Sequence, residues 1–349
     1  MDYLKRADES GAYLRGKLQR AMPWARSVIV CALNYNAAAP RSIDPAPAGS
    51  GWIARYAWSG GDPARAAQQV RPEQPPRGSD YHDVLLPKLR QIEVALHERF
   101  GPTVQSRCYV DTGPIVERSF ASLAGVGWIG KNTCVLNQQQ GSWLLLGVIV
   151  TSLELAPDAF AIPAADRCGS CTRCIDACPT GALLGSGDRN APRTMDASRC
   201  IAYLTIEKKG SIAEELRALM GRQVFGCDIC QDVCPWNRDQ PARAPIAPSA
   251  ALPARAELVN PALAWLAAMD GPTFNHWFRG SPLERTRRKH LRRNVAIAMG
   301  NSGDANFIPQ LEQMAAEPEP VVAEAARWAL TRPSQDWSCS ETETQDSKL

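Results

Sequence analysis

The 349-residue sequence lacks long apolar runs and a strong excess of either charge sign. Its longest apolar run, Trp143–Val150, has eight residues, far fewer than the ~20 that span a bilayer as a helix. The first ten residues, MDYLKRADES, mix both charges, whereas a secretory signal needs an apolar stretch. The net charge is only +3, so a nucleic-acid partner would need a local basic surface. We therefore expect a cytoplasmic globular protein that does not associate with membranes.

Cysteine, in contrast, is abundant and unevenly distributed. The chain has twelve cysteines, and eight of them lie between Cys168 and Cys234. In a small secreted domain this density would indicate disulfides, but in a long cytosolic chain it indicates metal binding.

The spacing of these cysteines is that of an iron–sulfur protein. Residues 168–179 read CGSCTRCIDACP, the C-x2-C-x2-C-x3-C-P pattern of bacterial ferredoxins, whose fourth cysteine binds the other cluster. Residues 227–235 read CDICQDVCP, with one cysteine too few, and Cys200 can supply it. The crossover predicts one 4Fe–4S cluster on Cys168, Cys171, Cys174 and Cys234, and a second on Cys178, Cys200, Cys227 and Cys230.

Two alternatives to this interpretation exist. Paired C-x2-C motifs also build structural zinc sites, but the three successive cysteines and the two Cys-Pro endings count against zinc. The whole chain could be an electron carrier, yet the cysteine-rich part is barely a fifth of its length. The remainder therefore has another task.

Hydrophobic patterning predicts an α/β arrangement before the cysteines and helices after them. Short apolar runs at 28–33, 108–110 and 144–150 are typical of strands, and apolar residues at steps of three and four predict a helix over 84–100. Residues rich in Pro, Gly and Ala predict surface loops at 37–51 and 59–79, and a linker at 238–255.

Helical signals occupy the rest of the chain. A capping box, with Ser211 at the N-cap and Glu214 at N3, predicts a helix over 211–223. Residues 291–330 resemble one HEAT-type helix pair, with a turn at NSGDANF. The last nineteen residues are polar and are expected to fray.

Several segments together resemble the epoxyqueuosine reductase family. Besides both cysteine motifs, they are YVDTGPIVER (109–118), GWIGKN (127–132) and CIAYLTIE (200–207). The resemblance covers roughly residues 20–330. It implies a multi-domain α+β/α fold: a cobalamin-binding α/β reductase domain (1–157), a ferredoxin-like module with two 4Fe–4S clusters (158–240), an α-helical HEAT-like tRNA-binding domain (241–335) and a flexible tail (336–349).

The resemblance also implies a reaction, in which the epoxide of a modified base at the tRNA wobble position is reduced to an alkene and water leaves. Asp111 matches the family's proton donor. An unperturbed Asp titrates near ~3.9, so this role predicts that Asp111 is buried and protonated when substrate is bound. Taken without the resemblance, Asp111 reads as the cap of the turn at 112–114.

The glycine-rich turn 127–132 is expected to approach the cobalamin, whereas without the resemblance it reads as a plain helix C-cap. The four histidines form no motif that would replace the cofactor's own axial base. The predicted cofactor contacts are Arg55, Tyr56, Asp111, Lys131, Asn132, Val135 and Ser142.

A basic run at 279–293 is expected to contact tRNA phosphates, with Trp277 and Phe278 available to stack on bases. A basic run can also be an ordinary solvated face. The predicted contacts are Arg285, Arg287, Arg288, Lys289, Arg292 and Arg293. The other expected partner is an external low-potential electron donor, and the chain is expected to act as a monomer.

Two departures from the family pattern stand out. The chain is shorter before MDYLKRADES than such proteins usually are, and residues 58–79 separate an RYA segment from a DYH segment that the family tends to join. The nearest alternative enzyme is a reductive dehalogenase, which shares the cobalamin and ferredoxin parts but typically has an export signal and no helical repeat.

Overall fold

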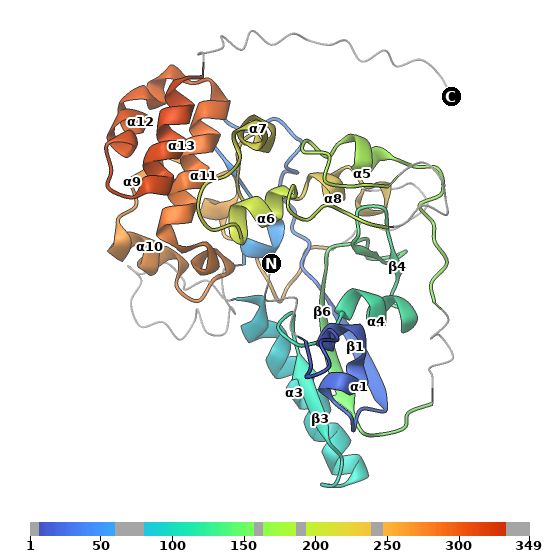
Figure 1. Cartoon of the computed structure of the whole chain (residues 1–349). Helices are drawn as coiled ribbons and strands as arrows, with labels where there is room; N and C mark the ends of the chain where they lie inside the picture. The colour runs from blue at the N-terminus through green and yellow to red at the C-terminus, as the bar shows by residue number, and fades with distance from the viewer. Residues whose placement is uncertain (1–6, 60–79, 157–162, 186–192, 239–246, 333–349) are drawn as a thin grey trace.

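The computed structural model describes residues 7–59, 80–156, 163–185, 193–238 and 247–332 (Figure 1). Nearly all of the predicted loop at 59–79, residues 239–246 of the predicted linker and the whole predicted tail 336–349 fall outside these residues. In the described part, no helix combines the length and the apolar character that crossing a membrane requires.

A three-stranded antiparallel sheet forms the first lobe. Its strands are β1 (Ser27–Asn34), β3 (Ser106–Tyr109) and β6 (Leu144–Thr151), in the order β1-β6-β3. Thr151 pairs with Ser27 on one side and Ser106 on the other. All three predicted strands are confirmed. The central strand β6 is the most buried because both neighbours and both faces cover it.

Helices cover both faces of this sheet. The 20-residue helix α3 (Tyr81–Phe100) packs on the face that includes Ile149, and α1 (Leu18–Ala21) and α4 (Glu117–Leu123) lie on the face that includes Val148. Alternate residues of β6 therefore point into two different cores. The helix predicted over 84–100 is confirmed, but it begins earlier because Asp80 caps it by accepting a hydrogen bond from the His82 amide.

The cysteine-rich module contains short elements between long connections. These are α5 (Arg173–Asp176), α6 (Ile201–Ile206), α7 (Glu214–Arg217), β7 (Gln223–Phe225) and α8 (Ile229–Asp232). Strand β7 pairs in parallel with β2 (Trp52–Ile53), and β4 (Trp128–Ile129) pairs with β5 (Val135–Leu136).

The helix predicted over 211–223 is wrong in its bounds and its cap. Helix α7 begins at Glu214 after Ala213 and ends at Arg217. The Ser211 hydroxyl bonds Glu324 of a distant helix, so it does not cap α7. A tertiary hydrogen bond has replaced the local one.

Helices form the C-terminal layer, at the upper left of Figure 1. They are α9 (Leu263–Ala268), α10 (Gly271–Phe278), α11 (Arg287–Ser302), α12 (Ile308–Ala315) and α13 (Pro320–Leu330). The two helices expected within 291–330 are present as α11 and α13, with α12 between them where only a turn was predicted. Single 3-10 turns occur at Leu14–Gly16, Arg55–Ala57, Ala218–Met220, Pro235–Asn237, Ala256–Leu258, Pro282–Thr286 and Ala305–Phe307.

Two polar residues of α11 join the helical layer to the cysteine-rich module. Arg293, only 1% exposed, donates to the carbonyls of Leu204 (2.8 Å), Lys208 (2.9 Å) and Gly210. Asn294 donates to the carbonyls of Thr205 and Val224. The helical layer and the segment 201–225 consequently share one hydrophobic core.

Replacing Arg293 with Met should lower the free energy of unfolding by about 3 kcal/mol, because three carbonyls lose a buried donor. Urea denaturation followed by circular dichroism measures the change. Arg287→Met, at the exposed start of the same helix, is the matched control and should stay within about 0.5 kcal/mol of the wild type. Equal stability of the two variants would contradict the structural role of Arg293.

Candidate active site

The first predicted group of thiols comes together around α5. Cys168, Cys171, Cys174 and Cys234 line one cavity of about 240 Å³. Burial, with the neighbouring thiols Cys168 and Cys171, raises the pKa of Cys174 to about 11. Burial also raises the pKa of Cys234 to about 12, with Cys174 and Cys168 adding to it. Cys234 thus lies beside cysteines that are about sixty residues away in sequence.

The second predicted group lines a larger cavity of about 440 Å³. Its members are Cys178, Cys200, Cys227 and Cys230. Burial raises the pKa of Cys227 well above its ordinary value, and Cys200 and Cys178 contribute to the shift. The crossover predicted from spacing is therefore the arrangement in space.

Local geometry explains how each Cys-Pro motif divides its cysteines between the two groups. The four-residue helices α5 and α8 contact one another, and each is followed by a cysteine and a proline. Cys178 and Cys234 follow these helices, and each lines the cavity of the other group. Among the described residues, no three Cys, His, Asp or Glu side chains converge closely enough to bind a single metal ion. A 4Fe–4S cube holds its sulfur ligands farther apart than one ion does.

The larger cavity is also lined by Asp111. Asp111 follows β3 and adopts a left-handed conformation with a φ of 59°. The Tyr81 hydroxyl donates a hydrogen bond of 3.0 Å to its Oδ2, and Arg285 donates to the Tyr81 hydroxyl over 3.2 Å. All three residues line the cavity. The prediction that Asp111 is buried is not met in this structure, where Asp111 is exposed.

Comparison with known proteins agrees with this geometry. Residues 167–237 match the family model described as 4Fe-4S double cluster binding domain, and residues 15–62 match the one described as Epoxyqueuosine reductase QueG, DUF1730. The epoxyqueuosine reductase of Synechocystis sp. is 41% identical over 283 residues, which cover 80% of this chain and 86% of the relative. This chain belongs to the epoxyqueuosine reductase family.

Solved structures of epoxyqueuosine reductases share the fold. One, with a tRNA-Tyr epoxyqueuosine-modified tRNA stem loop, is 31% identical with a TM-score of 0.72, covering 89% of this chain and 74% of that chain. Another, from Bacillus subtilis, has its catalytic aspartate loop swung out of the active site. It is 29% identical with a TM-score of 0.73, covering 94% of this chain and 78% of that chain.

The predicted cofactor contacts divide between different places in this epoxyqueuosine reductase family member. Tyr56, Asp111 and Asn132 line the larger cavity, and Lys131 with Asn132 lines the smaller one. The Lys131 amine, buried, donates to the Gly169 carbonyl. Val135 and Ser142 are buried, and in the part of the chain that the structure describes they line neither of these two cavities.

The glycines of the turn 127–132 have a packing role. A Cβ on Gly127 would lie 2.1 Å from the Leu136 carbonyl oxygen, and one on Gly130 would lie 2.4 Å from the Leu136 side chain. These glycines therefore permit the close pairing of β4 and β5. The expectation that these glycines also bring the backbone close to a cofactor stays a prediction.

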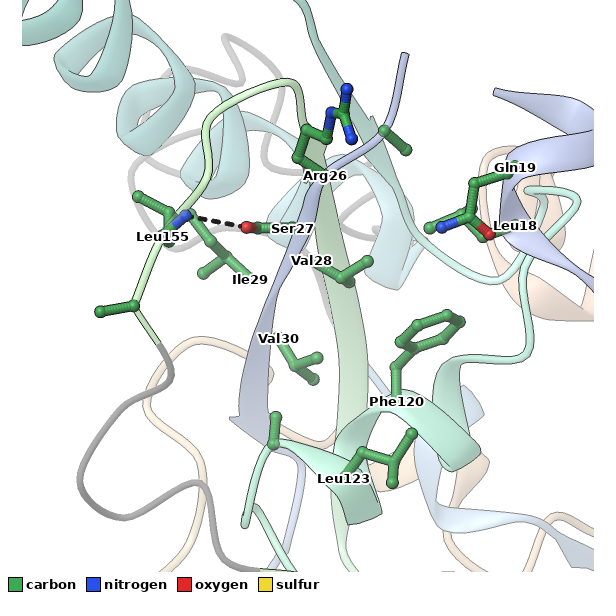
Figure 2. A pocket seen from close by; sticks show the side chains of 13 residues that line it. Leu18, Gln19, Arg26, Ser27, Val28, Ile29, Val30, Phe120, Leu123 and Leu155 are labelled. Carbon is green, nitrogen blue, oxygen red and sulfur yellow. Dashed lines mark hydrogen bonds between the residues drawn. The ribbon is translucent and has the colours of Figure 1, made fainter. Parts of the chain in front are cut away.

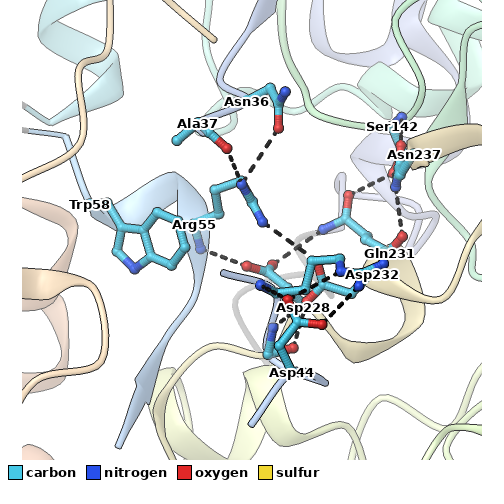
Figure 3. Close-up of polar contacts among 12 residues, drawn as sticks. Asn36, Ala37, Asp44, Arg55, Trp58, Ser142, Asp228, Gln231, Asp232 and Asn237 are labelled. Carbon is cyan, nitrogen blue, oxygen red and sulfur yellow. Dashed lines mark hydrogen bonds and ion pairs between the residues drawn. The ribbon is translucent and has the colours of Figure 1, made fainter. Parts of the chain in front are cut away.

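Arg55 faces a third cavity, behind a polar network that the sequence analysis did not identify (Figure 3). Its guanidinium lies 3.6 Å from Asp232 and stacks on Trp58 and Trp143, and its amide donates to Asp228. Burial, with the Asp232 carboxylate, raises the pKa of Asp228 to about 7. The available signal in the sequence was the pair of acids, Asp228 and Asp232, within the CDICQDVC segment itself.

The basic run at 279–293 does not form one surface. Arg287 and Lys289 are exposed at the start of α11, and Arg288 is half-buried with its Nε bonded to the Met269 carbonyl. Arg292 is buried against Glu317 and the Ala267 carbonyl. The predicted phosphate contacts of Arg292 and Arg293 are therefore wrong, because both guanidinium groups are occupied inside the protein.

The two aromatic residues before this run are also less available than predicted. Phe278 is fully buried in the helical core, so the prediction that it stacks on a base is wrong. Trp277 is half-buried against Trp265, with ring centroids 5.0 Å apart.

A fourth cavity, of about 700 Å³, lies between β1 and α4 (Figure 2). Val28 and Val30 of the strand face Phe120 and Leu123 of the helix across it. No residue of the predicted site lines it.

Cys174→Ser should remove one cluster and roughly halve the iron content of anaerobically purified protein, because each cube needs four thiolates. Iron analysis with electron paramagnetic resonance measures the loss. Cys31→Ser, in β1 away from both groups, should keep the full iron content. Zinc in place of iron in the wild type would contradict the assignment.

Proposed function

We propose that this chain reduces epoxyqueuosine in tRNA to queuosine, with two 4Fe–4S clusters and a cobalamin as its cofactors. The observation that carries the proposal is that four cluster thiols and Asp111 line the same cavity. Family membership supports the reaction, and a related structure with an epoxyqueuosine-modified stem loop supports tRNA as the substrate.

The lining of the larger cavity has the chemistry that a cofactor of this kind needs. Tyr56 and Tyr203 offer ring faces to a flat macrocycle, and Asn132 and Gln231 offer amides to its polar fringe. When bound, the clusters supply single electrons and the cobalamin supplies a reactive cobalt centre.

The residues of the chain supply the protons and the position. Converting an epoxide to an alkene and water takes two electrons and two protons. Asp111 stands at the cavity wall where it can give a proton to the departing oxygen, a role that contributes on the order of 10²–10⁴ in rate. Bound RNA would cover Asp111, exclude water from it and favour its protonated form.

In this proposal each part of the chain has a separate role. Residues 1–157 contribute Asp111, residues 158–240 bind the clusters, and residues 241–335 form a HEAT-like layer that binds RNA. Arg287 and Lys289 are the exposed cations of α11. An external low-potential donor supplies the electrons, and a monomer suffices because one chain carries both thiol groups and Asp111.

Asp111→Asn should retain iron, cobalamin and tRNA binding but lose turnover by a factor on the order of 10²–10⁴, because the amide cannot donate an acidic proton. Single-turnover assays with epoxyqueuosine-modified tRNA measure the loss. Asp83→Asn, exposed on α3, is the control and should turn over at the wild-type rate. Full activity of Asp111→Asn would refute its role.

Replacing both Arg287 and Lys289 with Ala should weaken tRNA binding and reduce the slope of log affinity against log salt by about two. Lys88→Ala with Arg107→Ala, which removes two cations from the other lobe, should leave the slope unchanged. An unchanged slope in the first variant would mean that these cations do not contact phosphates.

A further inference from the structure

An indole N–H group contacts one thiol of the first group. The Nε1 of Trp128 lies 3.4 Å from the Sγ of Cys168. Because an indole nitrogen can only donate, the hydrogen bond runs from Trp128 to the sulfur. Within the described residues, no other side-chain nitrogen donates to any of the eight predicted cluster thiols, and Cys178 of the second group receives a backbone amide instead. The contact therefore distinguishes the first thiol group from the second.

Packing from several sides holds Trp128 beside this sulfur. Trp128 belongs to β4 and is 3% exposed. It packs with Leu136 and Cys234 in one small hydrophobic core. The ring of Trp236 meets it edge-on, with the ring centroids 5.1 Å apart. The indole N–H is thus aimed at Cys168 by the packing of the whole ring.

The loop that carries Cys168 is held as well. Asp166 accepts a hydrogen bond of 2.7 Å from the Cys168 amide and forms an ion pair with Arg193. The buried Lys131 amine donates to the carbonyl of the next residue, Gly169, over 2.9 Å. Both ends of the contact between indole and sulfur are therefore anchored independently of each other.

A hydrogen bond to a ligand sulfur changes how readily a cluster takes up an electron. The added electron increases the negative charge on the sulfur atoms, and hydrogen bonds to more negative acceptors are stronger. An N–H donor consequently stabilises the reduced state more than the oxidised state. Hydrogen bonds to the sulfurs are among the factors that set the potentials of protein-bound clusters.

We infer that Trp128 raises the reduction potential of the cluster on the first thiol group, acting through its hydrogen bond to Cys168. This inference rests on the part of the proposed function that assigns a 4Fe–4S cluster to these four thiols. They line a cavity without Asp111, whereas the second group shares its cavity with Asp111. A higher potential makes the first group the better acceptor for an external donor.

The test is Trp128→Phe, which keeps an aromatic ring in the core and removes the N–H. In anaerobically purified protein with its full iron content, the equilibrium constant for reducing the first cluster should fall about tenfold, or about 59 mV for one electron. Redox titration followed by electron paramagnetic resonance measures both clusters in one sample. The potential of the second cluster should not change, and Cys174→Ser, which removes the first cluster, shows which signal belongs to it.

Trp236→Phe is the matched control. In the part of the chain that the structure describes, the Trp236 indole packs in the same core and donates to no sulfur. Its replacement should therefore leave both potentials at their wild-type values. A shift as large in Trp236→Phe as in Trp128→Phe would assign the effect to ring packing and overturn the inference.

A second measurement does not depend on how well a variant folds. In wild-type protein labelled with indole-¹⁵N tryptophan, electron spin echo envelope modulation of the reduced first cluster should show a ¹⁵N coupling, because the hydrogen bond carries spin density from the sulfur to the nitrogen. The coupling should persist in Trp236→Phe and vanish in Trp128→Phe. Its absence from the wild type, or an unchanged potential in Trp128→Phe, would each overturn the inference.

Iron content and turnover separate this inference from the proposed function. A wild type without iron would remove the cluster assignment and the inference with it. A wild type that holds both clusters but does not reduce epoxyqueuosine would contradict the proposed reaction alone, and the potential of the first cluster would still decide the role of Trp128.

Discussion

Hydrogen bonds from one buried turn of α11 fix the geometry on which the site depends. Arg293 and Asn294 bind carbonyls on both sides of the segment 204–224. Cys200 precedes that segment and Cys227 follows it, so the bonds to α11 constrain the separation of these two thiols more than the short elements between them do. This matters because α6, α7 and β7 are each too short to be stable alone. The helical layer is thus a structural requirement of the second thiol group.

Two buried carboxylates lie in the loop that carries Cys227 and Cys230. Asp228 and Asp232 flank Cys230 and are almost fully buried, which is costly unless each carboxylate is paired and hydrogen-bonded. The Arg55 amide donates to Asp228 and its guanidinium lies 3.6 Å from Asp232 (Figure 3). The Ser42 hydroxyl donates to Asp232. These contacts join the first lobe to the loop that carries Cys227 and Cys230. Removing one partner would leave the other charge buried without compensation.

How much could be predicted from the sequence depended on whether the residues that determine a feature are close together or far apart in the chain. The two thiol groups were predictable because the spacing of cysteines limits which sulfurs can meet, and α3 was predictable because its apolar stripe is local. The role of each cation in 285–293 was not predictable. Residues 290–300 of α11 are all buried, so no amphipathic pattern distinguishes its outer face. The capping box at Ser211 failed for a related reason, since Glu324, more than one hundred residues away, took its hydroxyl.

Backbone strain offers an independent view of where function lies. Four residues other than glycine have a positive φ in the described part of the chain: Asp111, Thr133, Asn260 and Arg287. Asp111 and Thr133 line the larger cavity, from the loops after β3 and between β4 and β5. Arg287 begins α11 two residues after Arg285, so one strained turn presents a cation to the cavity and another to solvent. Such conformations cost about 1–3 kcal/mol each, and three of the four occur at the proposed proton donor, in the lining of its cavity and at the start of the proposed RNA surface.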